Sequence, residues 1–254
     1  MLPFWSKELK LVNLFISSSL INSPTNIYHF FVKVTQGLKA YLSRDCPELC
    51  SRGVVLGYDG RHNSCRWANL AAGVFLRLAF VGINMLYVVS GQLDQFNVLT
   101  STHKSKYRGG VPVYLFRTTV PTPYVPFTIM ERGAAAGVMV TASHNPKWDN
   151  GYKVYWGNGA QILSPHDKNI QKAILENLEP HPDAFSVPDT NHQLLKNPMD
   201  EIHTSYLSKL PTFNTKSENN ELGHSIVYTA MHGVGHPYVR QSWITAGKRW
   251  KWGF

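Results

Sequence analysis

Short apolar runs rich in β-branched residues alternate with longer amphipathic segments, and this alternation limits the fold more than any other feature of the chain. The amphipathic segments predict helices at residues 28–44, 66–80, 121–135 and 164–180. The apolar runs predict strands at 53–59, 82–89, 111–116, 137–141 and 152–156. Strands that alternate with helices indicate an α/β architecture.

Three polar loops directly follow strand candidates. Their sequences are "DGRHNS" at 59–64, "TASHNP" at 141–146 and "HGVGH" at 232–236, the last after a strand candidate at 225–231. In α/β folds, ligands collect beyond the carboxyl ends of the strands. The sequence therefore predicts that these loops contribute to one site.

The C-terminal third has the pattern of a second unit. A proline-rich stretch at 180–188 has the composition of a linker, and a helix is expected at 201–210. A second helix is expected at 238–243, after the glycine-rich loop. Residues 90–110 are polar and weakly periodic, which predicts a long surface loop or an insertion.

The chain has a net charge of +9 and a pI of about 9.4, so its partners are expected to be anionic. The Lys and Arg residues are scattered and no nucleic-acid recognition motif accompanies them, so we expect no nucleic-acid partner. The other anionic partners that such a charge favours are phosphorylated metabolites and an acidic membrane.

Cysteines and apolar runs bear on the location of the protein. Three cysteines, Cys46, Cys50 and Cys65, support neither a disulfide framework nor a zinc site. No run approaches the ~18 apolar residues of a membrane span. Residues 11–21 loosely resemble a signal peptide, but Asn13 and three serines dilute the apolar run. We therefore expect a cytoplasmic protein without a membrane partner.

Ser143 is the strongest candidate for chemistry. A serine alone is a weak nucleophile and needs a base, a metal ion or surrounding donors. His144 and Asn145 follow at once, and Lys153 lies on the next strand. Such donors suit a dianionic phosphoryl group, and Arg61 in the loop at 59–64 could add a fork-shaped donor. A phosphorylated Ser143 would need a divalent cation, basic residues, or both.

Three other interpretations stay open at this point. Ser143 and Asn145 could simply cap backbone groups in a proline-terminated turn. A hydrolase triad would need a base and an acid near Ser143, and the chain has no "GxSxG" motif. His232 and His236 have the spacing of metal ligands on a helix, but the glycines between them favour a turn that opens the helix at 238–243.

The block "TASHNPKWDNGYKVYWGNGAQI", followed by "SPHDK", resembles the phosphoserine loop of the α-D-phosphohexomutase superfamily. It is most similar to the phosphoglucomutase-2 type, which comprises the phosphopentomutase branch and its sibling, glucose-1,6-bisphosphate synthase. Supporting matches are "TQGLKAYL", "GVVLGYDGRHNS" and "VPVYLFRTTVPTPYVPF", and the resemblance covers roughly 33–89 and 111–245. It implies an α/β domain with a mixed sheet between helices.

The resemblance also implies a function. Such enzymes are phosphosugar mutases, intramolecular phosphotransferases that interconvert the 1-phosphate and the 5- or 6-phosphate of ribose, deoxyribose or glucose in carbohydrate metabolism. Ser143 would carry the phosphoryl group, and a sugar 1,6- or 1,5-bisphosphate would be the intermediate and activator. His144 and Lys153 would lie near the transferring group, with Lys153 assisting proton transfer. Arg61 and Asn145 would bind phosphate.

Magnesium and organisation complete these expectations. Mg²⁺ would bind Ser143 through its phosphate, but the family's acidic metal loop and its sugar-specificity loop have no counterpart in this sequence. The expected organisation is a divergent lead at 1–32, a first domain at 33–190 with an atypical insertion at 90–110, and the incomplete start of a second α/β domain at 199–254. We thus expect a monomeric, truncated mutase. A catalytically inactive fragment, an interaction module and a synthase-like phosphotransferase stay open as alternatives.

Overall fold

A computed structural model describes residues 14–16, 24–77, 110–213 and 227–245. The strand expected at 82–89 and nearly all of the insertion expected at 90–110 lie outside these ranges. The expected division between a first domain and a second unit near Met199 stays a prediction.

The described residues form a six-stranded mixed sheet. In spatial order its strands are β1 (Leu14–Ile16), β5 (Asn150–Trp156), β4 (Ala136–Val140), β2 (Val54–Tyr58), β3 (Val113–Leu115) and β6 (Leu195–Lys196). The four strands from β4 to β6 are parallel to one another, whereas β5 runs antiparallel to both β4 and β1. The expected mixed sheet is therefore confirmed.

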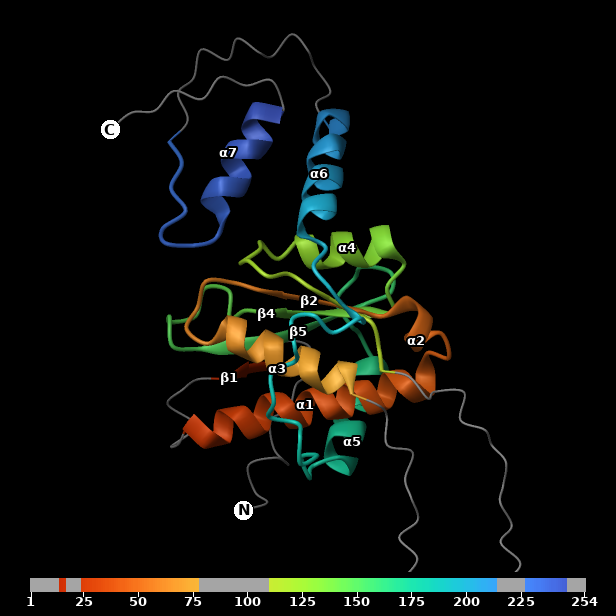
Figure 1. The fold of residues 1–254 in the computed structure, drawn as a ribbon. Coiled ribbons are helices and arrows are strands. Elements are labelled where there is room, and N and C mark those ends of the chain that lie inside the picture. The colour runs from red at the N-terminus through yellow and green to blue at the C-terminus, as the bar shows by residue number, and fades with distance from the viewer. Residues whose placement is uncertain (1–13, 17–23, 78–109, 214–226, 246–254) are drawn as a thin grey trace, which may run out of the picture.

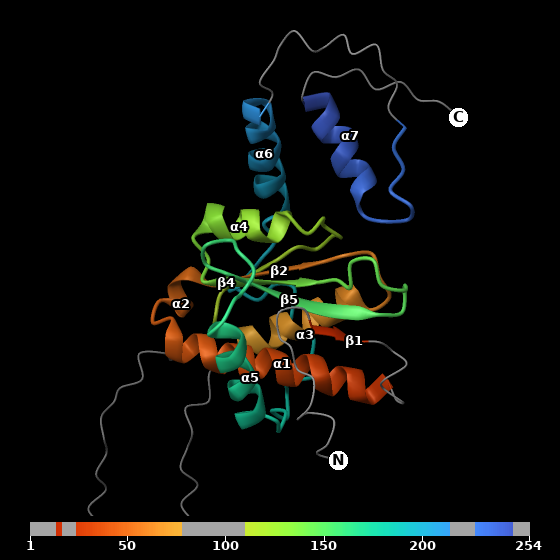
Figure 2. The ribbon, with the colours of Figure 1, turned by 180° about the vertical axis from the view of Figure 1, so that it is seen from behind.

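Helices cover both faces of this sheet (Figures 1 and 2). One face carries α1 (Pro24–Asp45), α3 (Ser64–Leu76) and α5 (His166–Glu176), and the short α2 (Leu49–Arg52) leads into β2. The other face carries α4 (Tyr124–Arg132). Beyond α4 stand α6 (Met199–Lys209), a 3₁₀ turn (Leu210–Phe213) and α7 (Gly235–Thr245). All the helices predicted from periodicity are present, with ends shifted by a few residues.

The core on the α1 side is aromatic. Phe31 and Trp67 stack with ring centroids 4.9 Å apart, and both side chains are buried. Each such side chain contributes about 1.5–3 kcal/mol through burial. Because Trp67 lies on α3, only three residues after the start of that helix, this packing fixes the helix directly behind the loop that follows β2.

The core on the α4 side depends on close approach. A Cβ at Gly137 of β4 would lie 2.7 Å from Ile129 Cδ1, and a Cβ at Gly57 of β2 would lie 2.6 Å from Val125 Cγ2. Two glycines on adjacent strands thus let α4 sit directly on the sheet. Tyr124, at the start of α4, extends this core through ring contacts to Tyr206 of α6 and Tyr238 of α7.

Some expectations about strands were wrong. Residues 227–230 of the strand expected at 225–231 form no strand, and Val227 is 96% exposed. A β-branched run forms a strand only where a neighbouring strand accepts its hydrogen bonds, and none does so here among the described residues. Conversely, β1 lies within the expected lead and β6 follows the linker-like stretch. Both are too short to show an alternating pattern.

Candidate active site

The loops at 59–64 and 141–149 lie side by side because β2 and β4 are parallel neighbours. Tyr58 pairs with Val140 in the strand register, and the Asp59 amide donates to the Val140 carbonyl at 3.2 Å. The third polar loop also comes near, since a Cβ at Gly60 would lie 3.9 Å from Val234 Cγ2. The three loops thus lie near one another, and their contribution to one site stays a prediction.

Ser143 is held at each of its three polar atoms. Its amide donates to Thr141 Oγ1 at 3.1 Å, its carbonyl accepts from Arg61 Nη2 at 2.5 Å, and its Oγ accepts from Lys153 Nζ at 2.5 Å. The residue has a φ of 52°, in the left-handed region that is costly for a residue with a side chain. It is nevertheless exposed, so a fixed hydroxyl group faces solvent at the carboxyl end of β4.

Lys153 reaches Ser143 from the middle of β5, where it pairs with Met139 of β4. Partial burial lowers the pKa of the Lys153 ammonium, while the Asp59 carboxylate acts in the opposite direction. A lowered pKa increases the fraction of neutral amine near neutral pH, and a neutral amine can accept a proton. The pair Lys153–Ser143 therefore has the geometry of a base and its nucleophile.

Arg61 occupies the space beneath the loop. Its Nη2 donates to the carbonyls of Ser143 and Asn145, at 2.5 and 2.7 Å. Its Nη1 donates to the carbonyls of Pro146, at 2.6 Å, and of Asp149, at 3.4 Å. The sequence placed Arg61 near Ser143 correctly, but these contacts are with protein backbone. A phosphate-binding role for Arg61 stays a prediction.

The remaining predicted residues are also on this loop. His144 is exposed beside Ser143, and its ring makes no hydrogen bond among the described residues. Asn145 turns its side chain inward, where Nδ2 donates to Asp149 Oδ2 at 3.2 Å, and its amide donates to the Ala142 carbonyl at 3.0 Å. The structure brings all five predicted site residues together, and their individual roles stay predictions.

Two important residues were not singled out from the sequence. Asp59 accepts from the Arg61 amide at 3.1 Å and from Ser64 Oγ at 2.8 Å, and its Oδ2 lies 3.2 Å from Arg61 Nε. Asn150 is buried and joins the two loops: its Nδ2 donates to the His62 carbonyl at 3.0 Å and to Ser64 Oγ at 3.1 Å. The sequence signal for both residues was their position, since Asp59 directly follows β2 and Asn150 begins β5.

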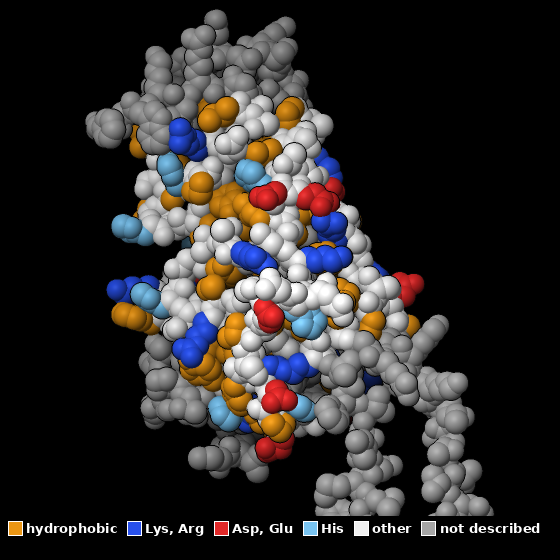
Figure 3. Space-filling model, viewed as in Figure 1, with side chains coloured by type: hydrophobic (Ala, Val, Ile, Leu, Met, Phe, Trp, Pro, Cys, Tyr) orange, Lys and Arg blue, Asp and Glu red, His pale blue; other side chains and the backbone are white. Residues whose placement is uncertain are grey.

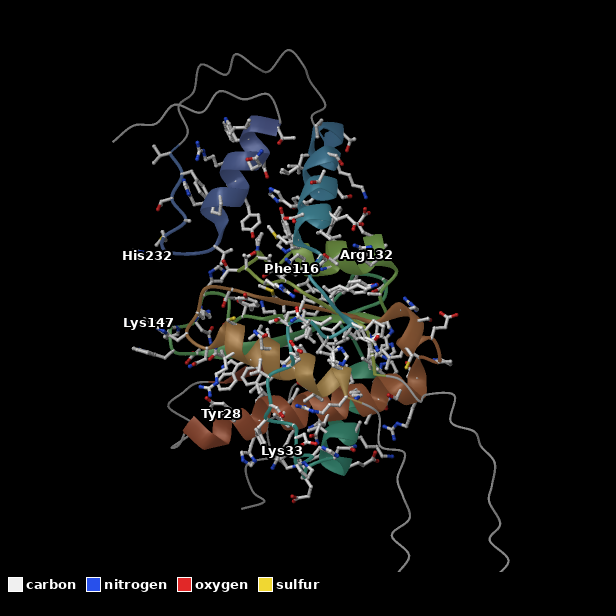
Figure 4. The ribbon with its side chains drawn as sticks, viewed as in Figure 1. Tyr28, Lys33, Phe116, Arg132, Lys147 and His232 are labelled. Atoms are coloured by element: carbon white, nitrogen blue, oxygen red, sulfur yellow. The ribbon has the colours of Figure 1, made fainter. Side chains whose placement is uncertain are left out.

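The outer rim of the site is aromatic and basic. His62 stacks on Trp148 with ring centroids 4.8 Å apart, and Lys147 Nζ lies 4.7 Å from the centre of the Trp148 ring. Figure 4 shows Lys147 projecting away from the sheet at the edge where the β4–β5 loop turns, and His232 on the same side of the molecule. On the face seen in Figure 3, basic and acidic side chains are interspersed and form no basic stripe.

Side chains that could act together as metal ligands are sparse among the described residues. These residues contain no group of three or more His, Cys, Asp or Glu side chains able to hold a metal ion. Asp59 and Asp149, the carboxylates of these loops, already accept hydrogen bonds from neighbouring side chains. His232 and His236 lie on a turn and at the start of α7, as the glycine-turn interpretation predicted.

Sequence comparison identifies relatives for most of the chain. Residues 96–181 match the family described as phosphoglucomutase/phosphomannomutase, alpha/beta/alpha domain I. Human phosphopentomutase is 40% identical over 220 residues, which is 83% of this chain and 31% of the relative. Human glucose 1,6-bisphosphate synthase is 38% identical over 225 residues, 85% of this chain and 31% of the relative. A probable phosphoribomutase from Schizosaccharomyces pombe is 38% identical over 213 residues, 82% of this chain and 30% of the relative.

Solved structures show the same fold. A putative phosphomannomutase from Thermus thermophilus aligns over 85% of this chain and 39% of its own, with a TM-score of 0.60 at 19% identity. Parafusin, a phosphoglucomutase from Paramecium, aligns over 93% of this chain and 40% of its own, with a TM-score of 0.55 at 16% identity. The chain spans about a third of the length of the curated relatives it matches. Its fold, its serine loop and these relatives together place the chain in the α-D-phosphohexomutase superfamily, on the branch of phosphopentomutase and glucose 1,6-bisphosphate synthase.

Proposed function

We propose that this chain carries the phosphoryl-accepting centre of a phosphosugar mutase, with Ser143 as the acceptor. The observation that carries this proposal is the exposed Ser143 hydroxyl, fixed by Lys153 and by the backbone at the carboxyl end of the parallel strands. Names of the relatives support a pentose or hexose phosphate as substrate.

The first step is the charging of the serine by a sugar bisphosphate. A bond forms between Ser143 Oγ and phosphorus while the bond from phosphorus to the sugar oxygen breaks. Neutral Lys153 takes the hydroxyl proton of Ser143, and the departing sugar oxygen takes a proton from solvent, which leaves a sugar monophosphate. In the return step the phosphoryl group passes to the free hydroxyl of a bound sugar monophosphate, whose proton goes to solvent, and the charged Lys153 gives its proton back to Ser143 Oγ. Transfers of this type depend mainly on positioning and on neutralisation of charge.

Two neighbours of the serine would assist the transfer. His144 is exposed next to Ser143, where a ring N–H could donate to the phosphoryl oxygens. Asn145 uses one amide hydrogen on Asp149, and its second amide hydrogen makes no hydrogen bond among the described residues. Magnesium would neutralise the phosphoserine when bound. Because the described residues contain no group of three or more His, Cys, Asp or Glu side chains able to hold it, no step here depends on it.

The biological setting is part of the same proposal. Cys46, Cys50 and Cys65 are free thiols, as suits a cytoplasmic enzyme of carbohydrate metabolism. No helix in the described part of the chain is both long and apolar enough to cross a membrane. We propose a monomer whose partner is a phosphosugar and not a nucleic acid or a membrane.

The test is the intact mass of the purified chain after incubation with glucose 1,6-bisphosphate and Mg²⁺. We expect the mass to increase by one phosphoryl group in the wild type and to stay unchanged in Ser143→Ala. A Ser51→Ala variant is a matched control, since Ser51 is an exposed serine on α2, at the amino end of β2. A gain in Ser143→Ala would refute the assignment of the acceptor.

The second candidate function is an inactive fragment, which the absence of a metal cluster among the described residues favours. In that case the wild type gains no mass even at millimolar bisphosphate. A third outcome, charging followed by transfer to an added sugar phosphate and release of a bisphosphate, identifies a synthase-like phosphotransferase. Turnover of ribose 1-phosphate or glucose 1-phosphate by the chain alone would establish a complete mutase.

A further inference from the structure

We infer that Arg61 is a positioning residue for Ser143 and does not bind the phosphate of the substrate. This inference concerns the same site and rests on the proposed function for its kinetic consequences. Its structural basis is the number of hydrogen-bond donors on Arg61 and the identity of the atoms that receive them.

A guanidinium group has five N–H donors in a fixed planar fork. In Arg61 the four donors on Nη1 and Nη2 face the carbonyls of Ser143, Asn145, Pro146 and Asp149. The fifth donor is on Nε, which lies 3.2 Å from Asp59 Oδ2. The four donors on Nη1 and Nη2 are thus directed at backbone carbonyls, and Nε faces the Asp59 carboxylate at ion-pair distance.

The Arg61 side chain is also largely shielded from solvent. It is 12% exposed, and the Asp59 side chain that pairs with it is 15% exposed. Asp59 is itself fixed, because it accepts hydrogen bonds from the Arg61 amide and from Ser64 at the start of α3. The guanidinium therefore connects the end of β2 to four of the seven residues from 143 to 149.

This clamp has a consequence for the serine. Ser143 lies in the left-handed region, a conformation that persists only where its surroundings enforce it. The hydrogen bond from Arg61 to its carbonyl is one of three contacts that hold it there. Without the fork, the loop can relax and the hydroxyl leaves its position beside Lys153. A misplacement of about 1 Å can lower a rate by about 100-fold.

A phosphate ligand and a clamp respond differently to substitution. Arg61→Lys keeps the positive charge but cannot reach four carbonyls, whereas a role in phosphate binding would be partly kept by lysine. We expect Arg61→Lys and Arg61→Met to lower the rate constant for charging Ser143 by about 10- to 100-fold. The concentration of glucose 1,6-bisphosphate for half-maximal rate should stay within about twofold of the wild type, because a positioning residue does not touch the substrate.

Arg52 provides a matched control. It also donates to backbone carbonyls, to Gly133 at 2.7 Å and to Ala134 at 3.0 Å, but it lies at the opposite end of β2. Arg52→Lys and Arg52→Met should lower stability by amounts similar to the Arg61 variants. Their charging rates should stay within about twofold of the wild type, since they do not touch the serine loop.

A second measurement does not depend on activity. Hydrogen exchange of the backbone amides in residues 143–149 should become at least about tenfold faster in Arg61→Lys and should not change in Arg52→Lys. Unchanged exchange in this loop would overturn the inference whatever the rates show. A half-maximal concentration that rises tenfold or more with an unchanged charging rate would also overturn it and would identify Arg61 as a phosphate ligand.

The two proposals can fail separately. If the wild-type chain gains no phosphoryl group, the proposed function fails, and the exchange measurement alone still decides whether Arg61 holds the loop. If the wild type is charged and Arg61→Lys is charged at the same rate, the inference about Arg61 fails and the proposed function stands.

Discussion

Replacement of Asn150 by alanine tests how the two site loops are joined. Asn150 is 5% exposed, and its side chain makes three hydrogen bonds. Its Oδ1 accepts from the Trp67 indole at 3.1 Å, and its Nδ2 donates to the His62 carbonyl and to Ser64 Oγ. The alanine variant removes all three.

The three losses are unequal. The Trp67 side chain is only 2% exposed, so its N–H loses its acceptor without access to water, which costs about 1–3 kcal/mol. Ser64 keeps its bond to Asp59, and His62 is an exposed residue whose carbonyl can bind water, so each of these losses costs about 0.5–1 kcal/mol. We expect Asn150→Ala to lower the free energy of unfolding by about 2–5 kcal/mol in total.

Urea unfolding followed by circular dichroism measures this change. Asn158→Ala is the matched control: Asn158 is exposed at the far end of β5 and makes one local bond, to the Ala160 amide, so about 1 kcal/mol or less is expected. In the double variant Asn150→Ala/Trp67→Phe the N–H that lacked an acceptor is gone. The loss of stability in the double variant should therefore be about 1–2 kcal/mol smaller than the sum of the losses in the two single variants. Additivity within 0.3 kcal/mol would show that the indole bond is not the main term.

Three further predictions concern the base, a buried lysine and a helix crossing. Lys153→Met should lower the rate of Ser143 charging by about 100-fold or more. The wild-type rate should rise with pH and reach its midpoint below 10.5, because burial lowers the pKa of Lys153. A wild-type rate that does not change with pH would exclude Lys153 as the base. Burial lowers the pKa of Lys39 to about 8. Above this pH the unfolded chain binds more protons than the folded chain, so the free energy of unfolding rises with pH. Urea titrations should show a rise of about 1 kcal/mol per pH unit between pH 8 and 9. The same rise in Lys39→Met would contradict this account. Gly37→Ala should lower stability by about 1–3 kcal/mol, since the new Cβ would lie 2.5 Å from Ile174 Cα, and shortening that side chain with Ile174→Val should not restore it.

The sequence predicted the central layer of the fold and the proximity of the candidate site residues. β2, β4 and β5 were predictable because each is a short run of apolar, β-branched or aromatic residues bounded by turn residues. Lys153 could be placed near Ser143 because a strand returning from a short loop pairs with the strand before it. The strand expected at 225–231 could not be judged in this way, since a strand depends on a neighbour that may lie far away in sequence.

The direction of buried polar side chains was not predictable. Arg61 was correctly placed beside the serine loop, but nothing in its sequence context distinguishes a guanidinium that faces backbone carbonyls from one that faces solvent. Asn150 stood inside the quoted block without an assigned role, because its three partners come from separate segments of the chain. Hydrogen bonds between distant segments are set by tertiary packing, and a linear pattern carries no record of them.

The left-handed backbone at Ser143 also limits which amino acid could serve as the proposed phosphoryl acceptor there. Threonine has the same hydroxyl chemistry, but its second Cβ substituent makes a positive φ a severe outlier, whereas serine tolerates a φ of 52° at modest cost. The chirality of the main chain thus favours serine over threonine, although the two hydroxyl groups would react alike with a phosphoryl donor. The backbone conformation alone therefore disfavours the substitution of threonine for serine at this position, independently of any effect on catalysis.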